Sequence, residues 1–412
     1  MKYGLIGEHL SHSFSKPIHE QIGGYVYEIK EIEPENVEAF MKAKEFSGIN
    51  VTIPYKEKVI PYIDVIDESA KKIGAVNTVV NRRGRLYGYN TDFTGMLALI
   101  KRADIDVENK KVLIIGTGGT SKTATAVVNH LGAREIIYVS HSRVEGAYTY
   151  EEIYENHLDT QVIFNTSPVG MFPRNELIPI DLDRFENIEG LIDVVYNPIR
   201  TALVLKAKEK GIKSEGGLYM LGAQAVYAYE HFSGRSVDKS LCDRVFNNIL
   251  KSKENIALIG MPSCGKSSIG KALATLSNKA FVDIDAEIVQ LAQMDIPSIF
   301  EQLGEEKFRD IESDVIKEVS KRNGLIIATG GGAILRKENI DALKQNATVV
   351  FIDRSLDLLI PTSDRPLGNS KEAIKKRYEE RYPIYSSVCD VKVDGNGTVL
   401  DVAEKILEEY RK

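Results

Sequence analysis

Short apolar runs rich in β-branched residues alternate along the whole chain with longer segments in which apolar positions recur at helical spacing. This alternation predicts strands followed by helices, the pattern of an α/β fold with mostly parallel sheets. In the first 250 residues the predicted strands cover 2–7, 48–53, 112–116, 136–140, 162–166 and 191–195. The same pattern continues in the remainder, with predicted strands at 256–260, 280–284, 325–329 and 348–353.

Two glycine-rich turns each follow a predicted strand and begin a helix. The first reads GTGGTS at 116–121 and the second GMPSCGKS at 260–267, and they belong to different classes of phosphate-binding turn. A chain of 412 residues is too long for one ordinary hydrophobic core. We therefore predict a domain boundary between the two turns, in the polar stretch 251–255.

The composition adds limits on partners and location. Hydrophobic residues make up 43% and charged residues 27%, as in globular proteins, and the net charge of −6 gives no overall attraction for nucleic acid or acidic membranes. The cysteines Cys242, Cys264 and Cys389 have neither disulfide nor metal-site spacing, which fits a reducing compartment. The N-terminal residues lack a signal-peptide pattern, and no apolar run has the length of a membrane helix. We expect a cytoplasmic protein without nucleic-acid or membrane partners, and the oligomeric state stays open.

The first glycine-rich turn is typical of a dinucleotide site. Its glycines let the backbone approach a pyrophosphate, whose charge the following helix N-terminus stabilises. An NAD site would place an acidic residue at the end of the next strand, to bind the ribose 2′-hydroxyl. Here the chain reads Ser140-His-Ser-Arg143, which favours the 2′-phosphate of NADP. A purely structural turn, with Arg143 as a solvated surface charge, is the alternative interpretation.

Polar side chains stand on several turns within the first hundred residues. HSFSKP at 12–17 places two hydroxyls at alternate positions, able to bind one carboxylate, and NVTIPYK at 50–56 places a hydroxyl and an ammonium around a proline. GAVN at 74–77 and NTD at 90–92 add an amide and a carboxylate. Taken singly, each motif is ordinary turn chemistry. The side chains concerned are Ser13, Ser15, Thr52, Lys56, Asn77 and Asp92.

Together with NTSPVGM at 165–171, DVVYNP at 193–198 and GLYMLGAQ at 217–224, these motifs resemble shikimate dehydrogenase over residues 1–250. The resemblance implies NADPH-dependent reduction of 3-dehydroshikimate to shikimate. It also implies a substrate-binding domain of residues 1–100 with 219–250 and a Rossmann domain of residues 101–218. The substrate would be bound by Ser13, Ser15, Thr52, Lys56, Asn77, Asp92 and Gln224.

The same resemblance makes Lys56 and Asp92 the catalytic pair. Hydride reduction of a ring ketone builds alkoxide charge, which a nearby ammonium can stabilise and protonate, and Asp92 can orient that ammonium. The family's usual Asn-Arg-Thr at the 2′-phosphate loop reads Ser140-His-Ser142 here, so the strictness of the NADP preference stays open. The implied NADP-binding residues are Gly116, Gly118, Gly119, Thr120, Ser140, Ser142, Arg143, Met171, Tyr196 and Gly217.

The second glycine-rich turn fits the P-loop pattern G-x-x-x-x-G-K-S completely. Its backbone N–H groups would cradle phosphates, Lys266 would neutralise their charge, and Ser267 could ligate Mg²⁺. This pattern predicts a nucleoside triphosphate but leaves the acceptor unspecified. The P-loop residues expected to bind ATP are Ser263, Cys264, Gly265, Lys266, Ser267 and Ser268.

Further polar residues predict the acceptor site. FVDID at 281–285 would place Asp283 and Asp285 on one face of a strand end, the first near Mg²⁺ and the second near an acceptor hydroxyl. GEEKFR at 304–309 and the helical segment RYEER at 377–381 supply cations, among them Arg309 and Arg381. Taken singly, either arginine could be a plain surface charge. Three consecutive glycines at 330–332 end a strand and expose backbone N–H groups.

In this order, the motifs of the second half resemble shikimate kinase over residues 255–412. The resemblance implies that Arg309 and Arg381 pair with the shikimate carboxylate. Arg365 would close over the transferred phosphate and bind ATP, and catalysis would involve Lys266, Asp285 and Arg365. Two departures are a lid segment 359–364 without a further arginine and a turn 394–397 without a basic residue near the expected adenine. The implied shikimate-binding residues are Asp285, Arg309, Gly331, Gly332 and Arg381.

The product of the first expected reaction is the substrate of the second. We therefore interpret the chain as a bifunctional enzyme of chorismate biosynthesis that acts on the small molecules 3-dehydroshikimate and shikimate, with NADP(H), ATP and Mg²⁺. One alternative is that either half acts on a related substrate, such as quinate or another small polyol acid. Another is that one half is an inactive nucleotide-binding regulator, although the intact Lys56–Asp92 and Lys266–Ser267 sets oppose it.

Overall fold

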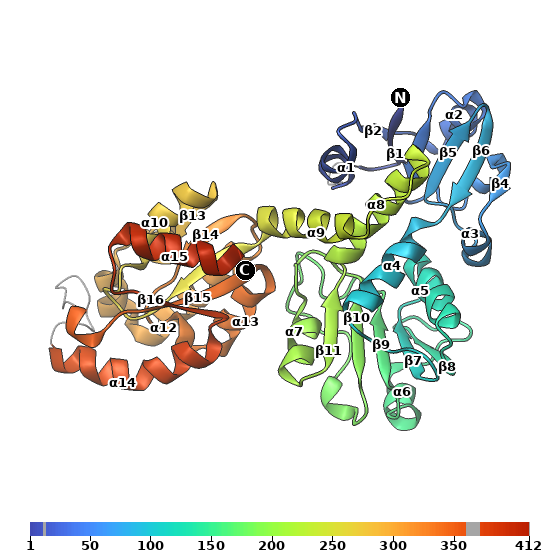
Figure 1. Cartoon of the computed structure of the whole chain (residues 1–412). Coiled ribbons are helices and arrows are strands. Elements are labelled where there is room, and N and C mark those ends of the chain that lie inside the picture. The colour runs from blue at the N-terminus through green and yellow to red at the C-terminus, as the bar shows by residue number, and fades with distance from the viewer. Residues whose placement is uncertain (11–13, 360–370, 412) are drawn as a thin grey trace. The chain divides into compact units, whose positions relative to one another are not determined.

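The computed structural model describes residues 1–10, 14–359 and 371–411 (Figure 1). The chain divides into two compact units, Met1–Leu250 and Lys251–Lys412. Helix α9 (Ser240–Lys253) crosses this division, and strand β12 begins at Asn255, so the polar stretch 251–255 is mostly helical rather than a loop. In the described part of the chain, no helix is both long and apolar enough to cross a membrane.

The first sheet of the first unit has six strands in the order β2-β1-β3-β5-β6-β4. Strand β1 pairs in parallel with β2 and β3, whereas β5 pairs antiparallel with both β3 and β6. Arg83 and Gly84 connect β5 to β6, and both have positive φ, as a type I′ hairpin turn requires. The strands are β1 (Tyr3–Gly7), β2 (Glu28–Glu31), β3 (Gly48–Val51), β4 (Val65–Ile66), β5 (Thr78–Arg82) and β6 (Arg85–Tyr89), accompanied by α1 (Ser15–Gly23), α2 (Val37–Ala43) and α3 (Glu68–Ile73).

The second sheet of this unit is wholly parallel, with the order β11-β10-β9-β7-β8. Alternate residues of β7 enter different hydrophobic clusters, Ile114 on one face and Leu113 on the other, because successive side chains of a strand point to opposite faces. The strands are β7 (Lys111–Ile115), β8 (Glu135–Val139), β9 (Val162–Asn165), β10 (Gly190–Asp193) and β11 (Lys213–Gly216). The helices of this part are α4 (Thr91–Arg102), α5 (Gly119–His130), α6 (Tyr150–Asn156), α7 (Ala202–Glu209) and α8 (Leu218–Ser233).

Helices α4 and α8 connect the two sheets of the first unit. Strand β6 leads directly into α4, and β11 leads directly into α8. The two helices share one buried core, to which α4 contributes Met96 and Leu99 and α8 contributes Ala223 and Val226. Gly95 lets the helices approach, since a Cβ at this position would lie 3.1 Å from the Cβ of Gln224.

The second unit contains a five-stranded parallel sheet in the order β13-β14-β12-β15-β16 around one core. All five residues of the central strand β12 are buried, as expected when helices cover both faces. The strands are β12 (Asn255–Ile259), β13 (Ala280–Asp283), β14 (Leu325–Ala328), β15 (Ala347–Asp353) and β16 (Val391–Asp394). The helices are α10 (Lys266–Ser277), α11 (Ile284–Ala292), α12 (Ile296–Ser320), α13 (Lys337–Asn346), α14 (Lys371–Val388) and α15 (Val399–Arg411). The predicted α/β architecture with parallel sheets is confirmed.

Asp193 is a fully buried carboxylate at the end of β10. It accepts hydrogen bonds from the backbone N–H of Val195 (3.0 Å), from Asn165 Nδ2 (3.0 Å) and from Thr201 Oγ1 (2.7 Å). These bonds join the ends of β9 and β10 to the start of α7. Burial nevertheless outweighs the three donors and raises the pKa of Asp193 to about 6.

We predict that Asp193 makes the first unit lose stability as pH rises from about 4 to about 6. The folded state binds the proton more tightly than the unfolded chain in this window, so the unfolding free energy falls with increasing pH. Asp193→Asn removes this titration. Relative to the variant, the unfolding free energy of the wild type should fall by roughly 3 kcal/mol between pH 4 and pH 7. Hydrogen–deuterium exchange of β9 and β10 measures this difference, and a difference independent of pH would contradict the prediction.

Candidate active sites

A cleft of about 500 Å³ in the first unit brings together residues that are far apart in the sequence. Its walls come from the six-stranded sheet, from α1, α4, α5 and α8, and from the loop that follows β10. The predicted residues that line it are Ser15, Thr52, Lys56, Asn77, Asp92, Thr120, Tyr196, Gly217 and Gln224. Sequence reasoning missed other lining residues, including His9, Phe14, Asn50 and Met220.

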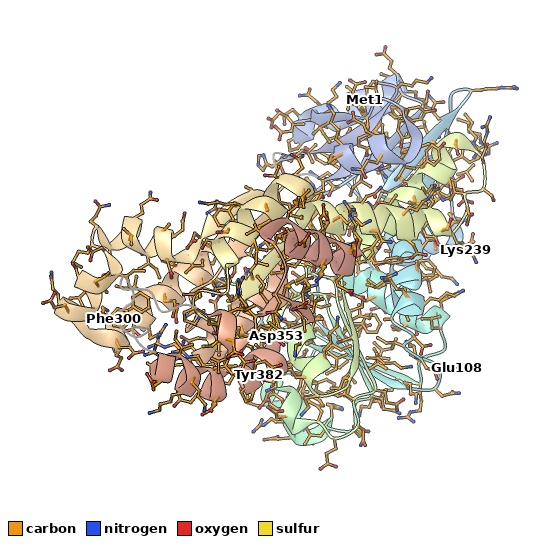
Figure 2. The ribbon with its side chains drawn as sticks, turned by 60° about the vertical axis from the view of Figure 1, so that its left-hand side comes forward. Met1, Glu108, Lys239, Phe300, Asp353 and Tyr382 are labelled. Atoms are coloured by element: carbon orange, nitrogen blue, oxygen red, sulfur yellow. The ribbon has the colours of Figure 1, made fainter. Side chains whose placement is uncertain are left out.

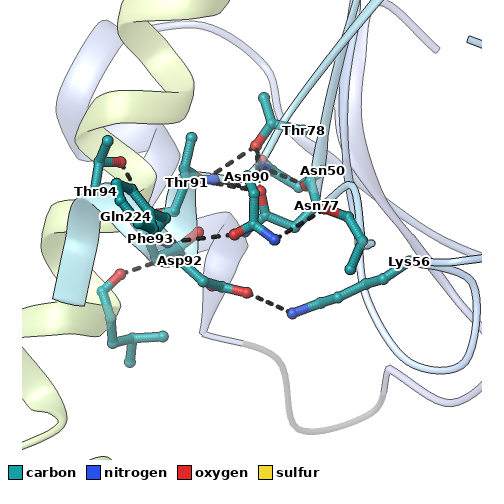
Figure 3. A network of polar contacts seen from close by, with 12 residues as sticks. Asn50, Lys56, Asn77, Thr78, Asn90, Thr91, Asp92, Phe93, Thr94 and Gln224 are labelled. Atoms are coloured by element: carbon teal, nitrogen blue, oxygen red, sulfur yellow. Dashed lines mark hydrogen bonds and ion pairs between the residues drawn. The ribbon is translucent and has the colours of Figure 1, made fainter. Parts of the chain in front are cut away.

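Lys56 and Asp92 form an ion pair in this cleft, with Lys56 Nζ 2.6 Å from Asp92 Oδ2 (Figure 3). Lys56 lies on the turn after β3, and Asp92 lies in the first turn of α4. Their side chains are 31% and 19% exposed, so a ligand in the cleft can reach the oriented ammonium. The pair can therefore stabilise a developing oxyanion and deliver a proton to it.

The N-terminus of α4 organises this part of the cleft through three consecutive residues (Figure 3). The side-chain oxygen of Asn90 caps the helix. Its Nδ2 donates to the carbonyl of Ala75, in the turn before β5, at 3.0 Å. The backbone N–H of Thr91 donates to Asn77 Oδ1 at 2.7 Å, while Asp92 holds Lys56. One helix end thus fixes the positions of Asn77 and Lys56 together.

The first glycine-rich turn has the space that a pyrophosphate needs. Gly116 has φ of +99°, and a Cβ there would lie 3.2 Å from Thr166 Oγ1, so glycine is required. A Cβ at Gly118 or Gly119 would meet no atom within 4 Å, so the N-terminus of α5 is open. These features fit the backbone binding of a dinucleotide phosphate.

The other residues predicted for NADP binding lie on the loops after β8, β9 and β10 and directly before α8. The loop with Ser140, Ser142 and Arg143 begins beside the turn, because the N–H of Gly116 donates to the carbonyl of Val139. Ser142 and Arg143 are exposed, and Met171, on the loop after β9, is 44% exposed and does not line the cleft. A separate cavity of about 1010 Å³ beside α5 includes Ser121 and the loop residues 144–147 but none of the predicted cofactor residues.

The second glycine-rich turn forms a loop between β12 and α10. Lys266 Nζ donates to the carbonyls of Gly260 (2.8 Å) and Met261 (3.0 Å), which keeps the ammonium at the loop. Cys264 is buried, and its N–H donates to the carbonyl of Met261. This cysteine therefore supports the loop here, whereas Ser267 and Ser268 are exposed.

Ser267 and Asp283 lie together, and Ser267 Oγ donates to Asp283 Oδ2 at 2.6 Å. Asp283 also caps α11, because its Oδ1 accepts from the N–H of Asp285 at 3.1 Å. The prediction that Asp283 and Asp285 share a strand face is therefore wrong. The cap ends β13 at Asp283 and places Asp285 in the first turn of the helix.

Side chains from α11, α12 and α14 converge on the three glycines that follow β14. Arg381 Nη1 donates to the carbonyl of Gly331 at 2.9 Å. A Cβ at Gly332 would lie 2.4 Å from Nη1 and Nη2 of Arg309, and one at Gly330 would lie 3.1 Å from Asp285 Oδ1. The absence of side chains at these glycines makes room for two largely buried guanidinium groups and a carboxylate.

Sequence reasoning missed Glu312 in this cluster. Its Oε2 accepts from Arg309 Nη1 at 2.7 Å, and burial raises the pKa of its carboxyl group. Among the described residues, no hydrogen-bond donor contacts its Oε1. The sequence signal that could have identified Glu312 is its spacing from Arg309, since a glutamate three residues after an arginine lies beside it on a helix.

A smaller cavity of about 360 Å³ lies at the ends of β15 and β16, where adenine was expected. Lys392, which lines it, pairs with Asp353 Oδ2 at 2.8 Å and donates to Tyr382 Oη at 2.6 Å. Asp353 and Tyr382 are labelled in Figure 2. The sequence prediction found no basic residue in the turn 394–397 because this lysine lies in the strand before it.

Ser13 and Arg365 lie outside the described residues.

Comparisons with known proteins match both units. The family described as shikimate dehydrogenase substrate binding domain matches residues 5–79, and the family described as shikimate kinase matches residues 262–411. Shikimate dehydrogenase (NADP(+)) of Clostridium beijerinckii is 36% identical over 264 residues, which cover 60% of this chain and 96% of that protein.

Two solved structures are similar to the first unit. Shikimate dehydrogenase 1 from Peptoclostridium difficile is 36% identical with a TM-score of 0.53, over 60% of this chain and 98% of that one. Shikimate 5-dehydrogenase from Thermus thermophilus, solved with NADP(H) and shikimate, is 26% identical with a TM-score of 0.53, over 60% of this chain and 99% of that one.

We predict that Gly332→Ala selectively damages the cluster of Arg309 and Arg381 in the second unit. The added Cβ would displace the Arg309 guanidinium, so an anionic ligand that pairs with this guanidinium should bind about ten- to hundredfold more weakly. The KM for shikimate in ATP-dependent phosphorylation measures this loss for the second unit alone. Dehydrogenase activity of the same variant reports the first unit, and ATP binding reports folding of the second. Unchanged shikimate binding by the second unit would contradict the prediction.

Proposed function

Because the chain belongs to the shikimate dehydrogenase family and carries a shikimate kinase domain, we propose that it catalyses two successive steps of the shikimate pathway with the residues assigned here. The first unit reduces 3-dehydroshikimate to shikimate with NADPH, and the second phosphorylates shikimate with ATP to shikimate 3-phosphate. The observation that carries the proposal is the Lys56–Asp92 pair at 2.6 Å, in a cleft lined by the predicted substrate residues Ser15, Thr52, Asn77 and Gln224.

In the dehydrogenase, we assign proton delivery to Lys56. NADPH, when bound, supplies the hydride that reduces the ring ketone. Lys56 stabilises the negative charge that develops on the ketone oxygen and donates a proton to it, while Asp92 keeps the ammonium in position. The donors and acceptors of Thr52, Asn77 and Gln224 bind the remaining hydroxyls and the carboxylate. Their placement around one cleft supports this assignment.

In the kinase, we assign substrate positioning to Arg309, Arg381 and Asp285. The two guanidinium groups pair with the shikimate carboxylate, and Asp285 accepts a hydrogen bond from a ring hydroxyl. Lys266 neutralises charge on the ATP phosphates. Phosphoryl transfer depends mainly on such positioning and charge neutralisation. The convergence of these side chains on Gly330 to Gly332 supports the assignment.

We assign Mg²⁺ to Ser267 and Asp283. A hydroxyl and a carboxylate oxygen 2.6 Å apart fit the oxygen ligands that this ion prefers. The ion would neutralise phosphate charge, directly or through water, beside Lys266.

We place both reactions in the cytoplasm. All cysteines of the chain lie in the described part, and Cys242, Cys264 and Cys389 are free thiols. Free thiols in all three positions support a reducing compartment.

We predict that the two activities can be removed separately. Lys56→Ala should lower reduction of 3-dehydroshikimate about 100-fold or more, because the proton donor is lost, and spare phosphorylation. Lys266→Ala should lower phosphorylation about 100-fold or more and spare reduction. Separate steady-state assays of each reaction measure both effects. The exposed lysines Lys58 and Lys271 provide matched alanine controls, which should keep both activities. Loss of both activities from either active-site change would refute independent sites.

We predict that phosphorylation alone requires Mg²⁺. Chelation should stop phosphorylation and leave reduction unchanged. Asp283→Asn should raise the Mg²⁺ concentration for half-maximal phosphorylation about tenfold or more. Asp314→Asn, on the exposed face of α12, serves as the control and should not change it. If Asp283→Asn needs the same Mg²⁺ concentration as the wild type for half-maximal phosphorylation, Asp283 is not a ligand of the proposed metal site.

A further inference from the structure

A buried chain of hydrogen bonds leads from Tyr27 to the wall of the dehydrogenase cleft. Tyr27 is fully buried and does not line the cleft, and its hydroxyl donates to Asn50 Oδ1 at 2.7 Å. The bond turns the amide of Asn50 so that Nδ2 faces β5. From there Nδ2 donates to Thr78 Oγ1 at 3.0 Å and to the carbonyl of Asn77 at 3.3 Å.

The chain continues from Thr78 to the side chain of Asn77 (Figure 3). Thr78 Oγ1 receives a hydrogen from Asn50, which leaves its own hydrogen for Asn77 Oδ1 at 3.0 Å or for Thr91 Oγ1 at 3.1 Å. Asn77 Oδ1 also accepts from the N–H of Thr91 at 2.7 Å and from its hydroxyl at 3.2 Å. The two donors of Thr91, joined by the hydroxyl of Thr78 when its hydrogen points to Asn77, hold this end of the amide inside the protein. Since Asn77 lines the cleft, its NH₂ group is the end left for a ligand.

We propose that Tyr27 and Thr78 are positioning residues that determine which hydrogen-bonding group Asn77 offers to the substrate. Through Asn50, and together with the two donors of Thr91, they keep Asn77 Oδ1 turned inward. The cleft therefore presents a donor at this point and selects a substrate with an acceptor oxygen there. Neither residue needs to touch the substrate. The proposal rests on the dehydrogenase function proposed above and explains part of its specificity.

The surroundings of Tyr27 keep the direction of these bonds constant. Its ring stacks on His19 at a centroid distance of 4.1 Å and an interplanar angle of 3°. Burial raises the pKa of Tyr27 well above its ordinary value, so its hydroxyl stays a donor. Burial also lowers the pKa of His19 to about 3, so the stacked ring stays neutral at the pH of ordinary assays.

Loss of either hydroxyl breaks the same chain. Without the Tyr27 hydroxyl, Asn50 Oδ1 loses the donor that lies 2.7 Å away, and the amide can reverse so that its oxygen accepts from Thr78 instead. The hydrogen of Thr78 is then no longer available to Asn77. Removal of the Thr78 hydroxyl has the same consequence for Asn77, so the two changes should not add.

The test measures oxidation of shikimate with NADP⁺ by the full chain. Tyr27→Phe and Thr78→Val should each raise the KM for shikimate about five- to tenfold, while kcat and the KM for NADP⁺ stay within about twofold. The double variant should match the single variants, and Thr78→Ser should restore the wild-type KM. Tyr25→Phe is the matched control. Its hydroxyl bonds His19 Nδ1 at 2.6 Å and makes none of the bonds from Tyr27 to Asn77, so its loss should not change the KM.

Shikimate analogues that lack one ring hydroxyl locate the affected contact. We compare the 4-deoxy and 5-deoxy analogues. The analogue that lacks the oxygen bound by Asn77 should have the same KM in the wild type and in Thr78→Val, because the orientation of Asn77 no longer matters to it. The other analogue should keep the difference between the two proteins. Additive losses in the double variant, equal losses with both analogues, or an unchanged KM in the single variants would overturn the proposal. A wild-type chain that does not oxidise shikimate with NADP⁺ would instead refute the proposed function.

Discussion

The ion pair between Lys56 and Asp92 depends on how the chain returns to the six-stranded sheet. The two residues are 36 positions apart, on the turn after β3 and at the start of α4. Strand β5 pairs antiparallel with β3, which places Thr78 opposite Asn50. Strand β6 then pairs with β5 and delivers the chain to α4 beside the same point. Without the β5–β6 hairpin, the fold would not bring Lys56 and Asp92 together.

A related constraint operates in the second unit, where a helix cap again arranges polar groups at strand ends. Asp283 ends β13, caps α11 and accepts from Ser267, so one carboxylate connects the P-loop to the helix that carries Asp285. In both units the N-terminus of a helix fixes two side chains that come from different elements. The chemistry of each site therefore rests on local backbone geometry that a capping residue enforces.

Sequence reasoning predicted the parallel strands and both glycine-rich turns because each has a strong local signal, in apolar runs or in glycine spacing. The β5–β6 hairpin was missed, since its antiparallel pairing depends on the turn at Arg83 and Gly84 rather than on an apolar run. Asn50 and Lys392 were also missed, because their positions follow from tertiary packing and not from a motif. Glu312 was missed although its spacing of three residues from Arg309 was visible in the sequence. The role of Asp283 as a helix cap could likewise not be predicted from the sequence. Asp285 was therefore placed on a strand, although it lies in the first turn of α11.

Both proposed sites act on one metabolite, so a single chain should carry 3-dehydroshikimate through two consecutive reactions. A combined assay supplies the purified chain with 3-dehydroshikimate, NADPH, ATP and Mg²⁺ and follows all products by mass spectrometry. We predict one shikimate 3-phosphate for each NADPH oxidised, shikimate alone when ATP is omitted, and no product when NADPH is omitted. Accumulation of shikimate despite ATP, or no oxidation of NADPH, would contradict the proposed pair of reactions.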